Sequence, residues 1–259
     1  MRAFPFKAFA AVLLTAGCSA APPEFLQYNV EWRLISAGTA KLSWTPSAAT
    51  QPASASAATG PSEVRLRLES SGLVSRLYKV DDDYRATLGA NLCAENSFMT
   101  AQEGSRSKET RVTYDSRAGK ASWQETDRQK NSTATREVEI PACVHDVMGG
   151  LMALRSLHLE PGKTARLPIS DGKKTVQARV EAQDRDDIKT PLGKFRAIRY
   201  EIFLFNDVLY KRPGHLHIWL TDDDRRLPVQ LQVRLQFTIG TITFRLVKED
   251  KNETPPPPH

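Results

Sequence analysis

Apolar and polar residues alternate with a period of two along most of this chain. In segment 28–34, Tyr, Val, Trp and Leu alternate with Asn, Glu and Arg, and segment 64–68 repeats the pattern. Segments 215–220, 229–236 and 241–246 form three further strand-like runs. Because successive side chains of a strand point to opposite faces, this alternation predicts strands with one buried face.

Turn chemistry separates the expected strands. Ala37-Gly38 divides the first run from its return, and Gly240 divides the last two. Segment 190–194 carries Pro at the second and Gly at the fourth position, which is typical of a hairpin turn. The order of strands and turns predicts a mainly β fold: a single antiparallel curved sheet, closed or half-closed into a barrel or β-roll.

One segment follows a helical period instead. Apolar residues recur every three or four positions over about 144–157, which predicts one amphipathic helix packed on the sheet. Gly149 and Gly150 each weaken a helix by about 1 kcal/mol, so we expect them at a close packing contact.

The two faces of this helix differ in polarity. Leu151 and Leu154 are expected to face the sheet interior, and Arg155 to lie on the opposite, polar face. The helix is then either a fixed element of the core or a movable lid over a ligand site, and both interpretations stay open.

The N-terminus has the composition of a secretory leader. Arg2 and Lys7 precede an apolar run that ends in small residues before Cys18, which predicts a signal peptide over 1–17. Ala16-Gly17-Cys18 resembles the lipobox of bacterial lipoproteins, in which the cysteine is acylated. Ordinary cleavage after Ala20 is the alternative.

Location follows from this leader. We expect an exported periplasmic protein, held by acylated Cys18 to the outer membrane of a Gram-negative bacterium. Residues 18–24 would form a tether, 25–248 the β-domain with a flexible Ala/Ser/Pro loop at 46–62, and 249–259 a disordered Pro-rich tail.

Export also assigns the other cysteines. Cys93 and Cys143 would remain as a pair in an oxidising compartment, where a disulfide is the usual outcome. It would close a loop of about 50 residues, worth about 4 kcal/mol in the chain-entropy model. A zinc site is the weaker alternative, because the two cysteines lack the short spacing that zinc ligands usually show.

The charge of the chain excludes one class of partner. A formal net charge of +6 is spread along the chain without a basic stripe, so we expect no nucleic-acid binding. No apolar run outside the leader approaches the roughly 20 residues of a membrane-spanning helix.

Several segments match a known family. The segments are 28–32, 37–40, 71–80, 83–84, 190–195 and 218–229, the last with its Trp, acidic, Arg-Arg and Leu-Pro string. Over about residues 25–248 the chain resembles the bacterial domain-of-unknown-function family 3108. The resemblance implies an exported envelope protein of mainly β structure, and it implies no activity.

Two acidic runs are candidates for chemistry. The run at 222–224, with the arginines that follow, is interpreted as a turn, or as a polar cluster of Trp219, Asp222, Asp224 and Arg226 that contacts a ligand. The run at 81–83 is interpreted as a solvated turn. We expect no metal site, because His215 and His217 share a strand face but lack a third ligand.

No arrangement for catalysis is recognisable. The chain lacks a Gly-x-Ser-x-Gly elbow, and its paired cysteines are assigned to a disulfide. We therefore expect a non-enzymatic protein without a cofactor that binds an apolar ligand such as a lipid, or a lipoprotein or partner protein of the envelope. The alternatives are a purely structural envelope protein with a solid core and, third, an envelope hydrolase.

Overall fold

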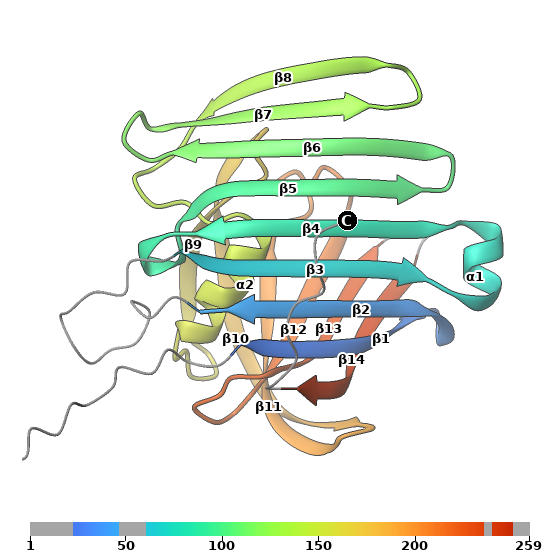
Figure 1. The fold of residues 1–259 in the computed structure, drawn as a ribbon. Coiled ribbons are helices and arrows are strands. Elements are labelled where there is room, and N and C mark those ends of the chain that lie inside the picture. The colour runs from blue at the N-terminus through green and yellow to red at the C-terminus, as the bar shows by residue number, and fades with distance from the viewer. Residues whose placement is uncertain (1–22, 47–60, 236–239, 251–259) are drawn as a thin grey trace, which may run out of the picture.

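The structure, a computed structural model, describes residues 23–46, 61–235 and 240–250. These residues form one antiparallel sheet of 14 strands with few helices (Figure 1). The strands are β1 (Glu24–Trp32), β2 (Ile35–Thr45), β3 (Ser62–Ser70), β4 (Val80–Leu88), β5 (Ala94–Glu103), β6 (Arg106–Asp115), β7 (Lys120–Asp127), β8 (Ser132–Glu139), β9 (Thr164–Ser170), β10 (Thr175–Thr190), β11 (Gly193–Phe203), β12 (Gly214–Thr221), β13 (Pro228–Leu235) and β14 (Gly240–Asp250). The helices are α1 (Gly72–Leu77), the short 3-10 turn η2 (Ala90–Leu92) and α2 (Val147–Ser156).

The chain enters the sheet at its centre. Strands β1 to β8 follow one another to one edge, the chain then passes through α2 to β9 at the other edge, and β10 to β14 return to pair with β1. The central pairing of β1 with β14 aligns Tyr28 with Leu246 and Val30 with Phe244. Strands that are consecutive in the chain are therefore adjacent in the sheet, except β8 and β9, which lie at opposite edges.

The sheet folds over into two layers. Figure 1 shows the strands β1–β8 running across those of β9–β14, with α2 between the layers at one side. Residues from both layers and from α2 form one buried apolar cluster, and a smaller cluster lies around Trp123 on β7. The core thus lies between the two halves of a single sheet.

The sheet is not closed into a barrel, so the expectation of full closure is wrong. The edge strands are β8 and β9, and they do not pair with each other. The edge of β9 is occupied instead by His145, whose backbone N–H donates to Pro168 and whose carbonyl accepts from Ser170. Because the segment before α2 satisfies these backbone groups, β8 is left as an exposed edge.

The predicted helix exists but is shorter than 144–157. It begins at Val147 because Asp146 caps it, accepting from the backbone N–H groups of Met148 at 3.3 Å and Gly149 at 2.9 Å. Leu151 and Leu154 are buried against the sheet interior, as predicted. Since seven of its ten residues are buried, α2 is a fixed core element in this structure.

The adjacent glycines of α2 lie at close contacts, as predicted. A Cβ at Gly149 would lie 2.5 Å from Oδ1 of Asp146, and one at Gly150 would lie 2.6 Å from Cδ1 of Ile169. A side chain at either position would push α2 away from β9 or from its own cap.

The prediction for Arg155 is wrong, because its side chain is buried. Its guanidinium pairs with the Glu24 carboxylate on β1, with Nη2 and Oε1 3.0 Å apart. It also donates to the carbonyls of Arg225 and Arg226 and lies over the Trp44 ring. The polar side of α2 is therefore covered by β1, β2 and the turn between β12 and β13.

Several boundaries differ from those expected. Strand β3 begins at Ser62 and β14 continues to Asp250, so both strands extend into segments expected to be flexible. The leader, Cys18, most of the 46–62 loop and the tail after residue 250 lie outside the described residues. Within the described ranges, no helix is long and apolar enough to cross a membrane.

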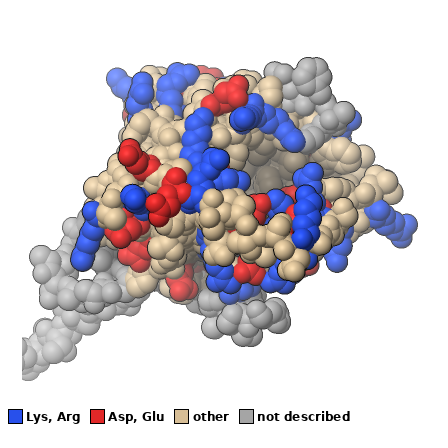
Figure 2. Space-filling model, turned by 90° about the horizontal axis from the view of Figure 1, so that it is seen from above, with Lys and Arg blue, Asp and Glu red and all other residues tan. Residues whose placement is uncertain are grey.

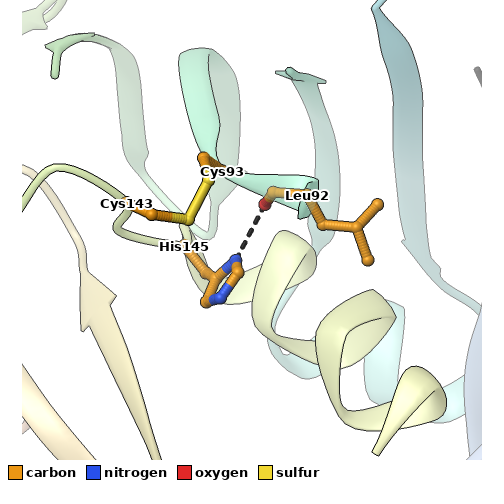
Figure 3. The surroundings of a disulfide bond; sticks show 4 residues. All are labelled: Leu92, Cys93, Cys143 and His145. Atoms are coloured by element: carbon orange, nitrogen blue, oxygen red, sulfur yellow. Dashed lines mark hydrogen bonds between the residues drawn. A yellow bond between two sulfur atoms is a disulfide. The ribbon is translucent and has the colours of Figure 1, made fainter. Parts of the chain in front are cut away.

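The predicted disulfide between Cys93 and Cys143 is present (Figure 3). It joins the residue before β5 to the segment that leads into α2, across 50 residues of chain. Two hydrogen bonds accompany it: Ala94 N–H donates to the Val144 carbonyl at 2.7 Å, and Nδ1 of His145 lies 2.8 Å from the Leu92 carbonyl oxygen. The crosslink fixes the start of α2 against the β4–β5 connection.

Replacing both Cys93 and Cys143 with serine should lower the free energy of unfolding by about 2–4 kcal/mol, because the reduced unfolded chain regains the entropy of an open loop. Urea unfolding of the variant and its parent measures the difference. An unchanged midpoint and slope would contradict a stabilising crosslink.

Candidate functional site

The four residues of the expected polar cluster do not converge on one point. Nε1 of Trp219 donates to Asp186 on β10 at 2.7 Å, and Asp222 pairs with Arg185. Asp224 is exposed in the turn between β12 and β13. These contacts connect β10 with β12 and the turn after it, across the intervening β11, and do not create a recess.

Arg226, the last member of that cluster, points into the core. Its Nη2 donates to the hydroxyl of Tyr200 at 2.6 Å, and that hydroxyl donates to the Leu159 carbonyl beyond α2. Arg226 thus links the β12–β13 turn to the chain that follows α2.

His215, His217 and Trp219 lie on one face of β12, as their spacing predicts. The rings of His217 and Trp219 are 6.0 Å apart, and Nδ1 of His215 lies 2.8 Å from Oε1 of Glu201. Burial lowers the pKa of His217. Among the described residues, no group of three or more His, Cys, Asp or Glu side chains is placed to hold a metal ion.

A cavity of about 290 Å³ lies beneath α2, between the two layers of the sheet. Val147, Met148, Leu151 and Leu154 of α2 form one wall. The other walls are apolar or aromatic side chains: Tyr28, Ala40, Leu42, Leu66, Leu167, Ile169, Ala178, Ile202, Leu204, Phe205, Tyr210, Leu216, Ile218, Leu231, Val233 and Phe244. Among the residues that the structure describes, no charged side chain lines this cavity.

The alternation of the strands produces this lining. Leu216 and Ile218 on β12, like Leu231 and Val233 on β13, are two positions apart and therefore share the inner face. Where a bulky residue would fill the space, the chain has Ala40 and Ala178, so a space is left between the inner faces at this place.

A second cavity, of about 620 Å³, lies between α1 and the last strands. Its walls include Trp32, Leu68 and Ile242, and its polar positions include Arg106 and Arg212. Phe244 lines both cavities, which places them next to each other inside the folded sheet. Apolar cavities with a few polar groups at one end are the usual form of small-molecule sites.

The surface is hollowed between the two layers. Figure 2, seen from above the β8 edge, shows the hollow with Lys and Arg side chains beside it.

Asp82 is the titratable group that sequence reasoning misplaced. The run 81–83 lies within β4 rather than in a solvated turn, and Asp82 is buried where it lines the second cavity. Burial, reinforced by Glu103, raises the pKa of Asp82 to about 6, although its carboxylate accepts a hydrogen bond from the Gln102 N–H at 3.0 Å.

Replacing Asp82 with asparagine should raise the melting temperature relative to the parent at pH 8 but not at pH 4. The raised pKa means that ionising Asp82 costs more in the folded than in the unfolded state. This cost grows as the pH rises from about 4 to about 6 and is fully present above that range. Thermal unfolding across this range measures it, and a parent–variant difference independent of pH would contradict the assignment.

The cavities themselves were not predicted from the sequence. The sequence feature that indicates a cavity is the presence of Ala40 and Ala178 at inward positions of strands whose other inward residues are large. How far apart the two layers lie depends on α2 and its contacts, which no local pattern reveals.

Fold and cavities together define a class: a β protein made of one folded-over sheet that encloses an apolar interior. The chain belongs to the DUF3108 family, described as a protein of unknown function, whose sequence pattern matches residues 27–247. No curated protein matches the chain.

One solved structure has a similar fold. A β-barrel-like protein of domain of unknown function DUF1849 from Brucella abortus matches with a TM-score of 0.59 and 11% identity, over 91% of this chain and 100% of that one. A DUF1089 family protein from Pseudomonas aeruginosa matches with a TM-score of 0.36 and 13% identity, over 85% and 95% of the two chains. The first match shows a similar fold and nothing more, and the second match is too weak to support a conclusion.

Proposed function

We propose that this protein is a non-enzymatic envelope protein that binds the hydrocarbon chain of a lipid between the two layers of its sheet. The observation that carries the proposal is the cavity beneath α2, whose lining of described residues is apolar and aromatic and contains no charged side chain. A hydrocarbon chain that enters such a cavity leaves water and makes dispersion contacts with the apolar walls. Both effects favour binding.

The lining of the second cavity favours a lipid, which has a polar head, as the ligand rather than a wholly apolar molecule. It adjoins the first at Phe244 and carries Arg106 and Arg212, which make no ion pair within the described part of the chain. Because the carboxyl groups of Glu69, Asp82 and Glu103 line the same cavity, this polar lining suits a ligand with a polar head.

The alternatives have weaker support. A purely structural protein with a solid core does not account for two cavities of about 290 and 620 Å³. For a hydrolase, the described residues that line the first cavity contain no acid, base or nucleophile other than tyrosine hydroxyls. Tyr28 donates its hydroxyl to the Pro228 carbonyl, so that group is already engaged.

Binding is tested with a fluorescent apolar probe, N-phenyl-1-naphthylamine, displaced by palmitic acid. Replacing Val147 with phenylalanine should weaken probe binding at least tenfold, because the larger ring enters the cavity from the half-buried first position of α2.

The matched control is Val138→Phe. Val138 is also half-buried but packs against the smaller cluster around Trp123, away from the cavity. It should bind the probe as the parent does. A parent protein that does not bind the probe, or two variants weakened equally, would contradict the proposal.

The location of the protein is part of the proposal. It rests on the leader-like residues 1–17 and on the lipobox-like Ala16-Gly17-Cys18. An acyl chain on the cysteine would attach the protein to a membrane, since each buried CH₂ contributes about 0.8 kcal/mol.

Intact-mass analysis of membrane-extracted protein tests the anchor. We expect a mature chain that begins at Cys18 and carries an acyl adduct. A chain that begins at Ala21 without an adduct would exclude lipidation and leave ordinary secretion.

A further inference from the structure

Exposed large apolar side chains gather at one end of the described structure. Among the described residues, six such side chains are exposed, and five of them lie in the β1–β2 turn or in and just after α1. These five are Leu34, Ile35, Leu73, Leu77 and Tyr78, each between 47% and 87% exposed. We call residues 33–35 and 71–79 the tip.

The two segments of the tip lie side by side. The N–H of Ser71 donates to the carbonyl of Ala37 at 2.8 Å, which holds the start of α1 against β2. Figure 1 shows α1 and the β1–β2 turn at the same end of the layer. Helix α1 has no fully buried residue, and although its Val74 packs against the core, its Leu73 and Leu77 are exposed.

The charge of the tip has one sign. The two segments contain Arg33, Arg76 and Lys79 and no acidic residue. Within the described ranges, neither Arg76 nor Lys79 makes an ion pair. Apolar side chains flanked by basic ones are the pattern of a protein surface that rests in the headgroup region of an anionic bilayer.

The tip also lies at the second cavity. Val74 of α1 and Tyr78 just after it line that cavity, as do Trp32 of β1 and Ala37 of β2. The ring of Tyr78 packs on Gly104, where a Cβ would lie 2.8 Å from the ring. A hydrocarbon chain leaving a membrane beneath the tip would meet the cavity directly.

We infer that the tip docks on the surface of a lipid bilayer with anionic headgroups, with Leu34, Leu73 and Leu77 inserted among the lipids. This inference rests on the proposed lipid binding and adds the route by which the lipid enters. A bilayer is the partner that fits, because basic residues flank the exposed apolar ones and because Val74 and Tyr78 of the tip line the second cavity.

The test places a reporter in the tip. Leu77→Trp adds a tryptophan at an exposed position of α1, and Leu192→Trp adds one at the exposed apolar side chain outside the tip, in the β10–β11 turn. The parent has four tryptophans, so the emission of the added tryptophan is obtained by subtracting the parent's emission from that of each variant. Vesicles contain equal parts of phosphatidylglycerol and phosphatidylcholine with brominated acyl chains.

We expect brominated vesicles to quench the added emission of the Leu77→Trp protein at least twofold and to leave that of Leu192→Trp unchanged. The comparison holds whether or not Cys18 anchors the protein, because an anchor alone brings neither position among the acyl chains. No quenching at Leu77→Trp, or equal quenching in both variants, would overturn the inference, as would docking on a partner protein without quenching.

A second arm tests the charge. The double variant Arg76→Gln, Lys79→Gln should need several-fold more phosphatidylglycerol for half-maximal quenching of Leu77→Trp, and an unchanged titration would overturn the role of the basic residues. Probe binding in solution keeps the two proposals separable. Quenching without probe binding would contradict only the proposed lipid binding in the cavity. Probe binding without quenching would contradict only the docking of the tip on a bilayer.

Discussion

The position of α2 depends on two buried charged side chains, one at each end of the helix. At the start, Asp146 caps the helix and accepts a hydrogen bond from the Tyr84 hydroxyl on β4. In the last turn, Arg155 pairs with Glu24 on β1 and donates to two carbonyls of the β12–β13 turn. Each charge also has the sign that suits its end of the helix dipole.

These contacts explain why the interior stays open. If α2 moved inward to fill the cavity, Asp146 or Arg155 would lose partners while remaining buried, and an unpaired buried charge costs several kcal/mol. Burial raises the pKa of Asp146, so its hydrogen bonds matter most when it is ionised. The disulfide at Cys93 and Cys143 adds a covalent constraint just before the helix. Polar and covalent contacts at the ends of α2 thus preserve an apolar space beneath its middle.

Local patterns predicted the parts of the fold that depend on neighbouring residues. Alternation in 28–34 and 64–68 identified β1 and β3, and the three-to-four-residue period identified α2. The turn expected at Ala37-Gly38 was wrong, because β1 ends at Trp32, the chain turns at 33–34, and Ala37 and Gly38 lie within β2. The six-residue α1 was too short to give a period, and its exposed Leu73 and Leu77 serve no core that a pattern could reveal.

The wrong predictions concern residues whose burial is determined by contacts with residues distant in the sequence and not by their own polarity. Asp82 and Arg155 were expected in solvent because charged residues usually are, but partners on other elements allow both to be buried. Closure of the sheet was expected from curvature, yet His145 occupies the edge of β9 that β8 would need. The cavities depend on the spacing between layers, which is set by contacts over 131 residues of chain, such as Arg155 with Glu24.

The central claim is that the space beneath α2 holds a hydrocarbon chain, and the most direct measurement is mass spectrometry of lipids that co-purify with the protein from its own membrane. The account predicts about one acyl-chain lipid per protein in the parent and a strong loss in Val147→Phe, whose ring occupies the cavity wall. A parent protein that carries no lipid, or a Val147→Phe protein that carries as much as the parent, would contradict it.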